Sequence, residues 1–366
     1  MKNSIVCEKQ RNVSLELLRI ISMIMIIILH LNFFGGLIEE VGTKVFTGKY
    51  IMVWASESLS MVAVNIYVFI SGYFLIKSKF KLSKIILLWI QVFFYSITIY
   101  IILVAIKQEV FSVKYFIKSI MPINFNQYWF ITIYLILYAI SPLINIVINS
   151  LDKSKHCMYI ILFMLIFCFL YVKNALNLAS GGGLLWFIYL YFVAAYIRLY
   201  YKPNKKYNKY LLSYIVFSIF TLVIKCIVDY LANSRGIMIS QESYLSYNSP
   251  AIFISSISLF LAALNFNISN RIVRRVIVCL SPFTLGVYLI HMHPQLAFVL
   301  WSKILFVCQY MQYNSYIYII VVLGVYFICT YIDFLRKKVF DKMKISILAD
   351  RIAKYICCKV INIFKF

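Results

Sequence analysis

Residues 15–30 read LELLRIISMIMIIILH, and this stretch decides the fold class. It opens an apolar run that extends to residue 34, close to the roughly 20 residues with which a helix crosses the apolar core of a bilayer. Lipid offers no hydrogen-bond partner to backbone N–H and C=O groups, so a segment of this kind must form a helix. The chain is therefore expected to enter a membrane with its first apolar segment.

The rest of the chain repeats this pattern. Of the 366 residues, 63% are apolar and 13% are charged, whereas soluble domains are about half apolar and a quarter charged. The sequence predicts an all-α, polytopic membrane bundle of about ten transmembrane helices, because strands of a membrane barrel would alternate in polarity. The predicted spans are 17–34, 50–76, 85–106, 128–149, 157–172, 184–200, 210–232, 250–268, 277–300 and 316–335.

The basic residues predict how the chain is oriented. The formal charge is +24, which in a soluble protein would favour nucleic acid as a partner. Here three quarters of the 36 lysines and arginines fall in alternate connections between spans and in the two ends of the chain. By the positive-inside rule, both termini are cytoplasmic, and we expect no nucleic-acid partner. Residues 1–335 form the predicted transmembrane domain, and residues 336–366 a basic, amphipathic cytoplasmic tail that contacts membrane lipid.

Two polar side chains of the first span lie on one helix face. Arg19 and His30 are eleven positions apart, which at 100° per residue is only about 20° past three full turns. Their separation along the axis is about 16 Å. Glu16, three residues before Arg19, can pair with the guanidinium. Arg19 is thus expected at the cytoplasmic edge, with His30 deeper in the membrane.

This arrangement has two interpretations. In the functional one, Arg19 grips the phosphates of a cytoplasmic donor, since a guanidinium fits phosphate geometry, and His30 handles protons at the reacting end. In the structural one, Arg19 is a positive-inside residue and His30 hydrogen-bonds a neighbouring helix.

Several segments resemble one family. RNVSLELLRIISMIMIIILH (11–30) is similar to the opening of the integral-membrane acyltransferase family 3, with Glu16, Arg19 and His30 at the family's acidic, arginine and histidine positions. VNIYVFISGYFL (64–75) resembles its second helix, where Ser71, Gly72 and Tyr73 are supporting residues. Further likenesses are YWFITIYLILYAISPLIN (128–145), GGGLLWFIYLYFVAAYIR (181–198) and SPFTLGVYLIHMHP (281–294). The last two resemble the branch that modifies cell-surface polysaccharides, and the similarity runs from about 11 to 335.

The resemblance implies an activity. Members transfer an acyl group, usually acetyl from acetyl-CoA, from the cytoplasm to a hydroxyl of a surface carbohydrate or glycolipid. The chain would then be a multi-pass O-acetyltransferase of the bacterial plasma membrane that modifies the cell envelope. Arg19 and His30 would be catalytic, with Arg19 steadying the donor. His30 would either activate the acceptor hydroxyl or carry the acetyl group itself, and the sequence does not separate these roles.

Other basic residues are candidates for donor binding. The family often begins its third helix with arginines, whereas this chain has Lys81 and Lys84 there; lysine keeps the charge but lacks the bidentate fork. Arg274 and Arg275 are further candidates. A solvated, positive-inside loop explains all four equally well or better.

Candidates for acceptor binding come from two other spans. Tyr288 and His291 are three residues apart and share a helix face, and His291 could equally make an interhelical hydrogen bond. Trp129 and Tyr134 could form a platform for a sugar ring, or could belong to the interfacial aromatic belt. His293 points away from His291, so the two cannot chelate one metal, and we expect no metal site.

Two other functions compete with acyl transfer. A flippase-type transporter of polysaccharide or lipid-linked oligosaccharide would also be polytopic, basic and aromatic-rich, but transporters often show two halves with matching breaks in hydropathy, and none is evident. A polysaccharide polymerase is expected to carry arginines in a large outer loop, whereas the predicted outer loops contain only Arg235.

Overall fold

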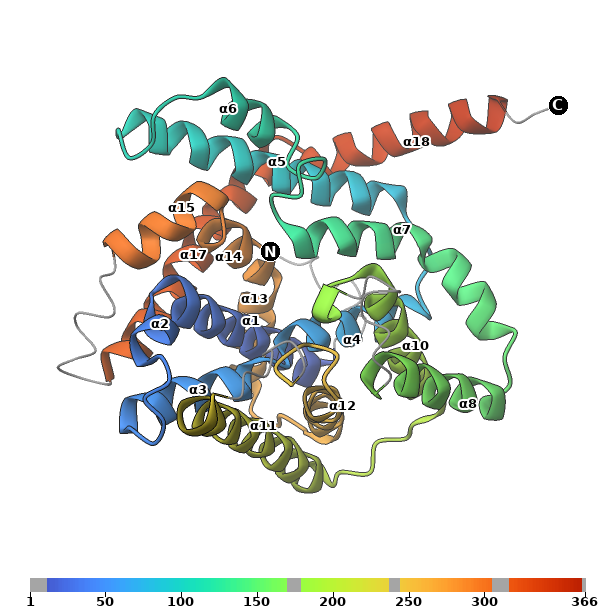
Figure 1. Ribbon diagram of the computed structural model, residues 1–366. Coiled ribbons are helices and arrows are strands. Elements are labelled where there is room, and N and C mark those ends of the chain that lie inside the picture. The colour runs from blue at the N-terminus through green and yellow to red at the C-terminus, as the bar shows by residue number, and fades with distance from the viewer. Residues whose placement is uncertain (1–11, 170–178, 237–243, 305–315, 364–366) are drawn as a thin grey trace.

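The computed structural model describes residues 12–169, 179–236, 244–304 and 316–363. Every regular element in these ranges is a helix (Figure 1). Seven helical segments within them are long and apolar enough to cross a membrane: Val13–Phe34, Gly48–Leu75, Leu82–Ala105, Trp129–Asn149, Tyr207–Arg235, Arg271–His291 and Tyr316–Lys342. A multi-pass helical architecture is thus confirmed, while the number ten and the side on which each terminus lies stay predictions.

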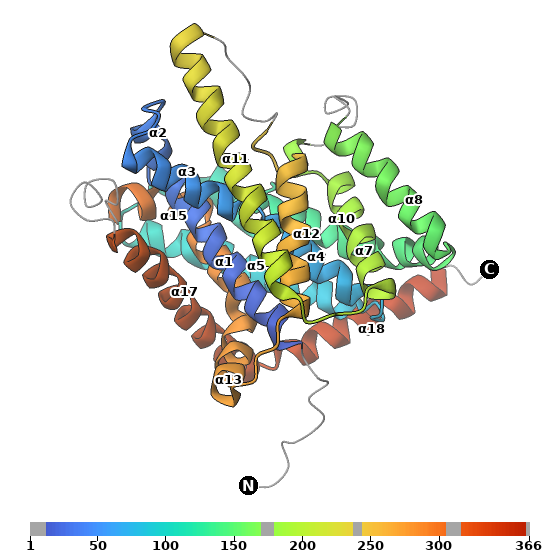
Figure 2. The same ribbon diagram turned by 90° about the horizontal axis from the view of Figure 1, so that it is seen from below.

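Helix α1 (Val13–Phe34) lies inside the bundle (Figures 1 and 2). The side chain of Asn12 caps its N-terminus by accepting from the amide of Leu15, which satisfies one of the free donors of the first turn. Helix α1 contacts α3 (Gly48–Ser60), α4 (Ala63–Leu75), α12 (Pro250–Asn265), α14 (Thr284–His291) and α17 (Tyr316–Lys342). Polar side chains along α1 therefore face protein on several sides rather than lipid.

The second predicted span, 50–76, consists of two helices. Helix α3 ends at Ser60 and α4 begins at Ala63, although neither glycine nor proline separates them. The short α2 (Leu37–Val41) links α1 to α3. Helix α4 packs against α10 (Leu184–Tyr200) so closely that a Cβ on Gly72 would lie 3.0 Å from the Cα of Tyr191.

The ninth predicted span, 277–300, is interrupted twice. Helix α13 (Arg271–Leu280) passes through the 3₁₀ turn η4 (Ser281–Phe283) into α14, which ends at His291. Helix α15 (Pro294–Phe298) then begins at Pro294 and continues as η5 (Val299–Ile304). The second interruption falls at Pro294, which has no backbone N–H and therefore cannot continue the helical hydrogen-bond ladder.

Five further helices belong to the bundle: α5 (Leu82–Ala105), α6 (Val113–Ile120), α7 (Trp129–Asn149), α8 (Lys153–Met164) and α11 (Tyr207–Arg235). The predicted span 157–172 begins inside α8, and its last three residues lie outside the described ranges. The spans predicted at 184–200 and 250–268 coincide with α10 and α12, which are apolar but shorter than 18 residues.

The C-terminal region consists of two helices. Helix α17 continues past the predicted start of the tail at residue 336 and ends at Lys342. Helix α18 (Ile345–Ile363) follows it, lies against α5 and extends away from the other helices (Figures 1 and 2). Its exposed residues include both apolar side chains, such as Ile347 and Ile356, and basic ones, such as Arg351 and Lys354, as an amphipathic helix requires.

Candidate functional site

A cavity of about 420 Å³ lies beside α1, and we call it the main cavity. It is bounded by side chains from α1, α3, α4, α5, α7 and the η4–α14 segment. Six of the residues singled out from the sequence line it, namely Arg19, His30, Ser71, Trp129, Tyr134 and Tyr288. Arg19 and His30 therefore face one space, as their spacing along the helix predicts, and residues from the other segments named above join them there.

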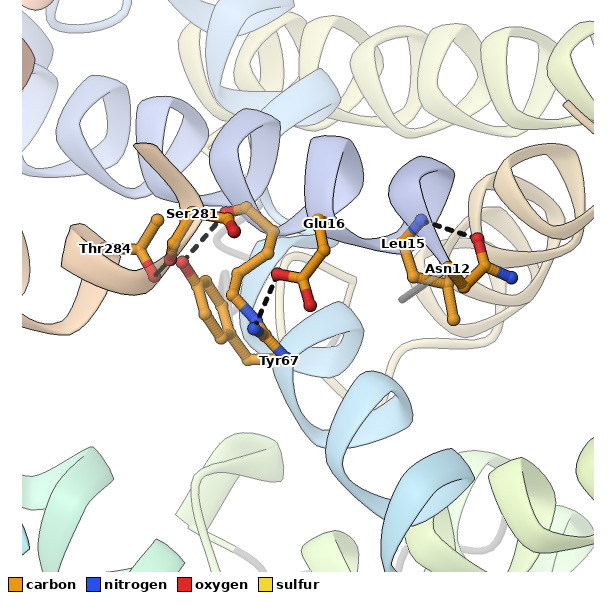
Figure 3. Close-up of polar contacts among 7 residues, drawn as sticks. Asn12, Leu15, Glu16, Tyr67, Ser281 and Thr284 are labelled. Atoms are coloured by element: carbon orange, nitrogen blue, oxygen red, sulfur yellow. Dashed lines mark hydrogen bonds and ion pairs between the residues drawn. The ribbon is translucent and has the colours of Figure 1, made fainter. Parts of the chain in front are cut away.

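Arg19 is held by its own helix. Its Nη1 lies 2.8 Å from Oε2 of Glu16, which is nearly buried, while the Arg19 side chain is 29% exposed. The hydroxyl of Tyr67 donates to the backbone carbonyl of Arg19 at 2.9 Å. Figure 3 shows Glu16 and Tyr67 in this cluster, with Ser281 and Thr284 beside Tyr67. Because a guanidinium carries five donors and Glu16 engages one nitrogen, donors remain for an anion.

His30 is hydrogen-bonded to a second histidine. Its Nδ1 lies 2.9 Å from Nε2 of His291, and Nδ1 of His291 lies 2.6 Å from the carbonyl oxygen of Val287. The His30 ring is partly exposed in the main cavity, whereas His291 is fully buried and does not line the cavity. Of the two alternatives for His291, the structure shows the interhelical hydrogen bond. His293 packs elsewhere, with Nε2 2.9 Å from the carbonyl oxygen of Ser96.

Glu57 is a cavity residue that sequence reasoning missed. It lies on α3, is 8% exposed and lines the main cavity. Asn32 donates from Nδ2 to Oε2 of Glu57 at 2.8 Å, and Oδ1 of Asn32 accepts from the hydroxyl of Tyr318 at 2.9 Å. The sequence does hold a signal for Glu57, because it is an acidic residue within an apolar run. An ionisable side chain is costly to place in a membrane and therefore points to function. Among the residues that the structure describes, Arg19 and Glu57 are the arginine and the acidic residue that line this cavity.

A smaller cavity of about 250 Å³, the side cavity, adjoins the main one. The two cavities share Arg19, Ser71, Leu88 and Tyr134 as lining residues. Lys84 also lines the side cavity, although its residue as a whole is exposed. Arg19 therefore stands where the two cavities meet, and Lys84 gives the side cavity a second cationic group.

A groove of about 710 Å³, the aromatic groove, lies on another side of the main cavity. Its walls include Trp129, Tyr247, Gly182 and Gly183. The rings of Trp129 and Tyr247 are stacked, with centroids 6.2 Å apart and planes inclined by 20°. Both residues line the main cavity as well as the groove, so this pair of rings forms part of the wall between them.

Seven of the predicted residues line neither the main nor the side cavity, and two of them, Glu16 and His291, are described above. Lys81 is exposed at the start of α5, where its backbone amide donates to the hydroxyl of Tyr138. Arg274 and Arg275 are exposed on α13. Gly72 and Tyr73 face α10 instead: Gly72 allows the close approach of that helix, and the Tyr73 hydroxyl accepts from Nη1 of Arg198 at 3.0 Å.

Comparison with known proteins gives one match. A family model described as "Acyltransferase domain" matches residues 12–343. No curated protein and no solved structure matches the chain. The matched range begins at the cap of α1 and ends just after α17, so it includes every residue of the three cavities described above.

Proposed function

The chain belongs to the acyltransferase 3 family, and from this premise we propose that it moves an acetyl or similar acyl group from cytoplasmic acyl-CoA to a hydroxyl of a surface polysaccharide or glycolipid. It is a membrane acyltransferase by family and by its apolar helices. The donor, the acceptor, the transfer to oxygen and the location in a bacterial plasma membrane are parts of the proposal.

The observation that carries the proposal is the pairing of a cation and an imidazole in one cavity. Arg19 and His30 both line the main cavity, with about 16 Å of helix between their positions. Coenzyme A has phosphates at one end and a thioester at the end of a thin pantetheine arm. We assign the phosphates to Arg19 and Lys84, where the side cavity meets the main one, and the thioester to the vicinity of His30.

In the first of two possible reaction courses, His30 acts as a general base. The imidazole takes the proton of the acceptor hydroxyl while its oxygen bonds to the acyl carbon. The carbon–sulfur bond then breaks, and the departing thiolate receives the proton from His30. In the second course, His30 attacks the thioester, the carbon–sulfur bond breaks and CoA leaves as the thiolate. The acceptor hydroxyl then displaces the imidazole from the acyl carbon, and its proton passes to the CoA thiolate.

The acceptor is assigned to the other walls of the main cavity. Aromatic faces bind the apolar faces of sugar rings, and Trp129 and Tyr247 offer two stacked rings between the aromatic groove and the main cavity. The carboxylate of Glu57 and the hydroxyl of Tyr288 line the same cavity and can hydrogen-bond sugar hydroxyls. Such contacts orient one hydroxyl toward His30, and orientation of this kind supplies much of the rate in transfer reactions.

The test is transfer of label. Membranes containing the full chain are incubated with radiolabelled acetyl-CoA and glycans of the producing cell, and His30→Ala is compared with wild type. We expect label on the glycan with wild type and loss of transfer with His30→Ala. Rapid quenching with denaturant at neutral pH during turnover separates the two courses, because only the second leaves label on the protein and an acyl-imidazole is hydrolysed in acid. A wild-type chain that transfers no label from any acyl-CoA contradicts the proposal and favours the transporter.

A further inference from the structure

We propose that His291 is a positioning residue that holds His30 in the tautomer with its proton on Nδ1 and its lone pair on Nε2. The inference rests on the proposed function only for what the Nε2 lone pair then does, which is to accept a proton or attack a thioester. The arrangement of protons itself follows from the hydrogen bonds.

The proton on His291 can be placed from its partner. Nδ1 of His291 lies 2.6 Å from the carbonyl oxygen of Val287, and a carbonyl oxygen can only accept. Nδ1 of His291 therefore carries a proton. In a neutral imidazole the other nitrogen is then a bare acceptor, so Nε2 of His291 accepts.

The same reasoning places the proton on His30. Nδ1 of His30 lies 2.9 Å from Nε2 of His291. Because Nε2 of His291 accepts this hydrogen bond, Nδ1 of His30 must donate it. The lone pair of a neutral His30 is then on Nε2. Because His30 is partly exposed in the main cavity and His291 is fully buried, the reactive nitrogen belongs to the ring that a substrate can reach.

The surroundings keep His291 in place. The segment that carries it is fixed by the hydroxyl of Tyr128, which donates to the carbonyl of Leu289 at 3.0 Å. A Cβ on Gly286 would lie 2.1 Å from Cγ of Asp333, so α14 and α17 pack in close contact. His291 is also the last residue of α14, and its ring centroid lies 6.2 Å from that of Trp301. A ring held in this way orients its partner, as a hydrogen-bonded neighbour orients a histidine that binds a metal.

The inference predicts different results for two substitutions. His291→Gln keeps an oxygen that can accept from Nδ1 of His30, so it retains the tautomer. His291→Phe keeps the volume and removes the acceptor, so His30 is free to carry its proton on Nε2. We expect kcat to fall about 10–100-fold in His291→Phe, the usual loss when an orienting partner is removed, with KM for the acyl donor unchanged and most of kcat restored in His291→Gln.

The matched control is His156. It is fully buried on α8, its Nε2 lies 3.0 Å from the carbonyl oxygen of Phe192, and it does not line the main cavity. His156→Phe therefore removes a buried histidine and an interhelical hydrogen bond without touching His30. We expect it to leave the kcat of acyl transfer and the His30 tautomer unchanged.

The direct readout is the ¹⁵N spectrum of the ring nitrogens. The chain has four histidines, so the full-length protein in lipid nanodiscs, labelled with ring-¹⁵N histidine, gives few signals, and His30→Gln identifies those of His30. We expect a protonated Nδ1 and a bare Nε2 for His30 in wild type and His291→Gln, and loss of that pattern in His291→Phe. A protonated Nε2 in wild type overturns the inference, as does a wild-type spectrum and kcat in His291→Phe. The spectrum does not depend on activity, so a wild type with the expected tautomer and no transfer from any acyl-CoA refutes the proposed function alone.

Discussion

Replacing Arg19 by alanine tests the assignment of the donor phosphates. A hydrogen bond to a charged group contributes about 1.5–3 kcal/mol, and each 1.4 kcal/mol is a factor of about ten in affinity. Arg19 is 29% exposed and already paired with Glu16, so screening favours the lower half of this range. We therefore expect Arg19→Ala to weaken CoA binding about 10- to 30-fold.

The assay is equilibrium binding of labelled CoA to the purified chain in nanodiscs, which needs no acceptor. Arg19→Lys keeps the charge and loses the planar fork, so its loss of affinity is expected to be smaller. Arg274→Ala is the matched control, because Arg274 is an exposed arginine of α13 that lines neither the main nor the side cavity. An Arg19→Ala chain that is folded by thermal unfolding and binds CoA like wild type would refute the assignment.

Three further results are expected. Lys84→Ala should raise KM for acetyl-CoA several-fold while Lys81→Ala leaves it unchanged, since only Lys84 lines the side cavity; equal effects of both would indicate a diffuse charge effect. Glu57→Gln keeps an oxygen for Asn32 and loses the charge, so we expect KM for the glycan acceptor to rise about ten-fold at unchanged CoA affinity; a changed CoA affinity would place Glu57 on the donor side. Gly286→Ala forces a methyl group into the buried Asp333 and should destabilise the protein by about 1–3 kcal/mol, seen as a lower unfolding temperature; wild-type stability would mean that α14 and α17 separate easily.

The sequence predicted the helical architecture and the shared helix face of Arg19 and His30. Long apolar segments can only be helices in lipid, and the 3.6-residue period puts Arg19 and His30 on one face. Local sequence does not determine where α3 gives way to α4, because no proline or glycine marks the end at Ser60. The break between α3 and α4 depends on packing against other helices, and the sequence of one segment does not determine that packing.

Which of the other site residues line a cavity also depends on packing between helices. Lys81 and Lys84 are chemically identical and three positions apart, yet only the second lines a cavity. Glu57 was overlooked because the apolar run around it masks a single acidic residue, and its importance becomes visible only when α3 is placed beside α1. The bond between His30 and His291 joins residues 261 positions apart, a distance over which spacing rules carry no information.

The wall shared by the main cavity and the aromatic groove also indicates which side chains would have to move to connect the two spaces. On one side of this wall Trp129 begins α7, and on the other the amide of Tyr247 donates to the carbonyl of Ser180 at 3.1 Å. Gly181 has φ +82, and a Cβ there would lie 2.7 Å from Cβ of Tyr247, so the loop fits against this residue only without a side chain. A ligand that crossed this wall would have to displace the rings of Trp129 and Tyr247. Side-chain rotations of this kind are generally faster than the microsecond-to-millisecond displacements of helices and domains.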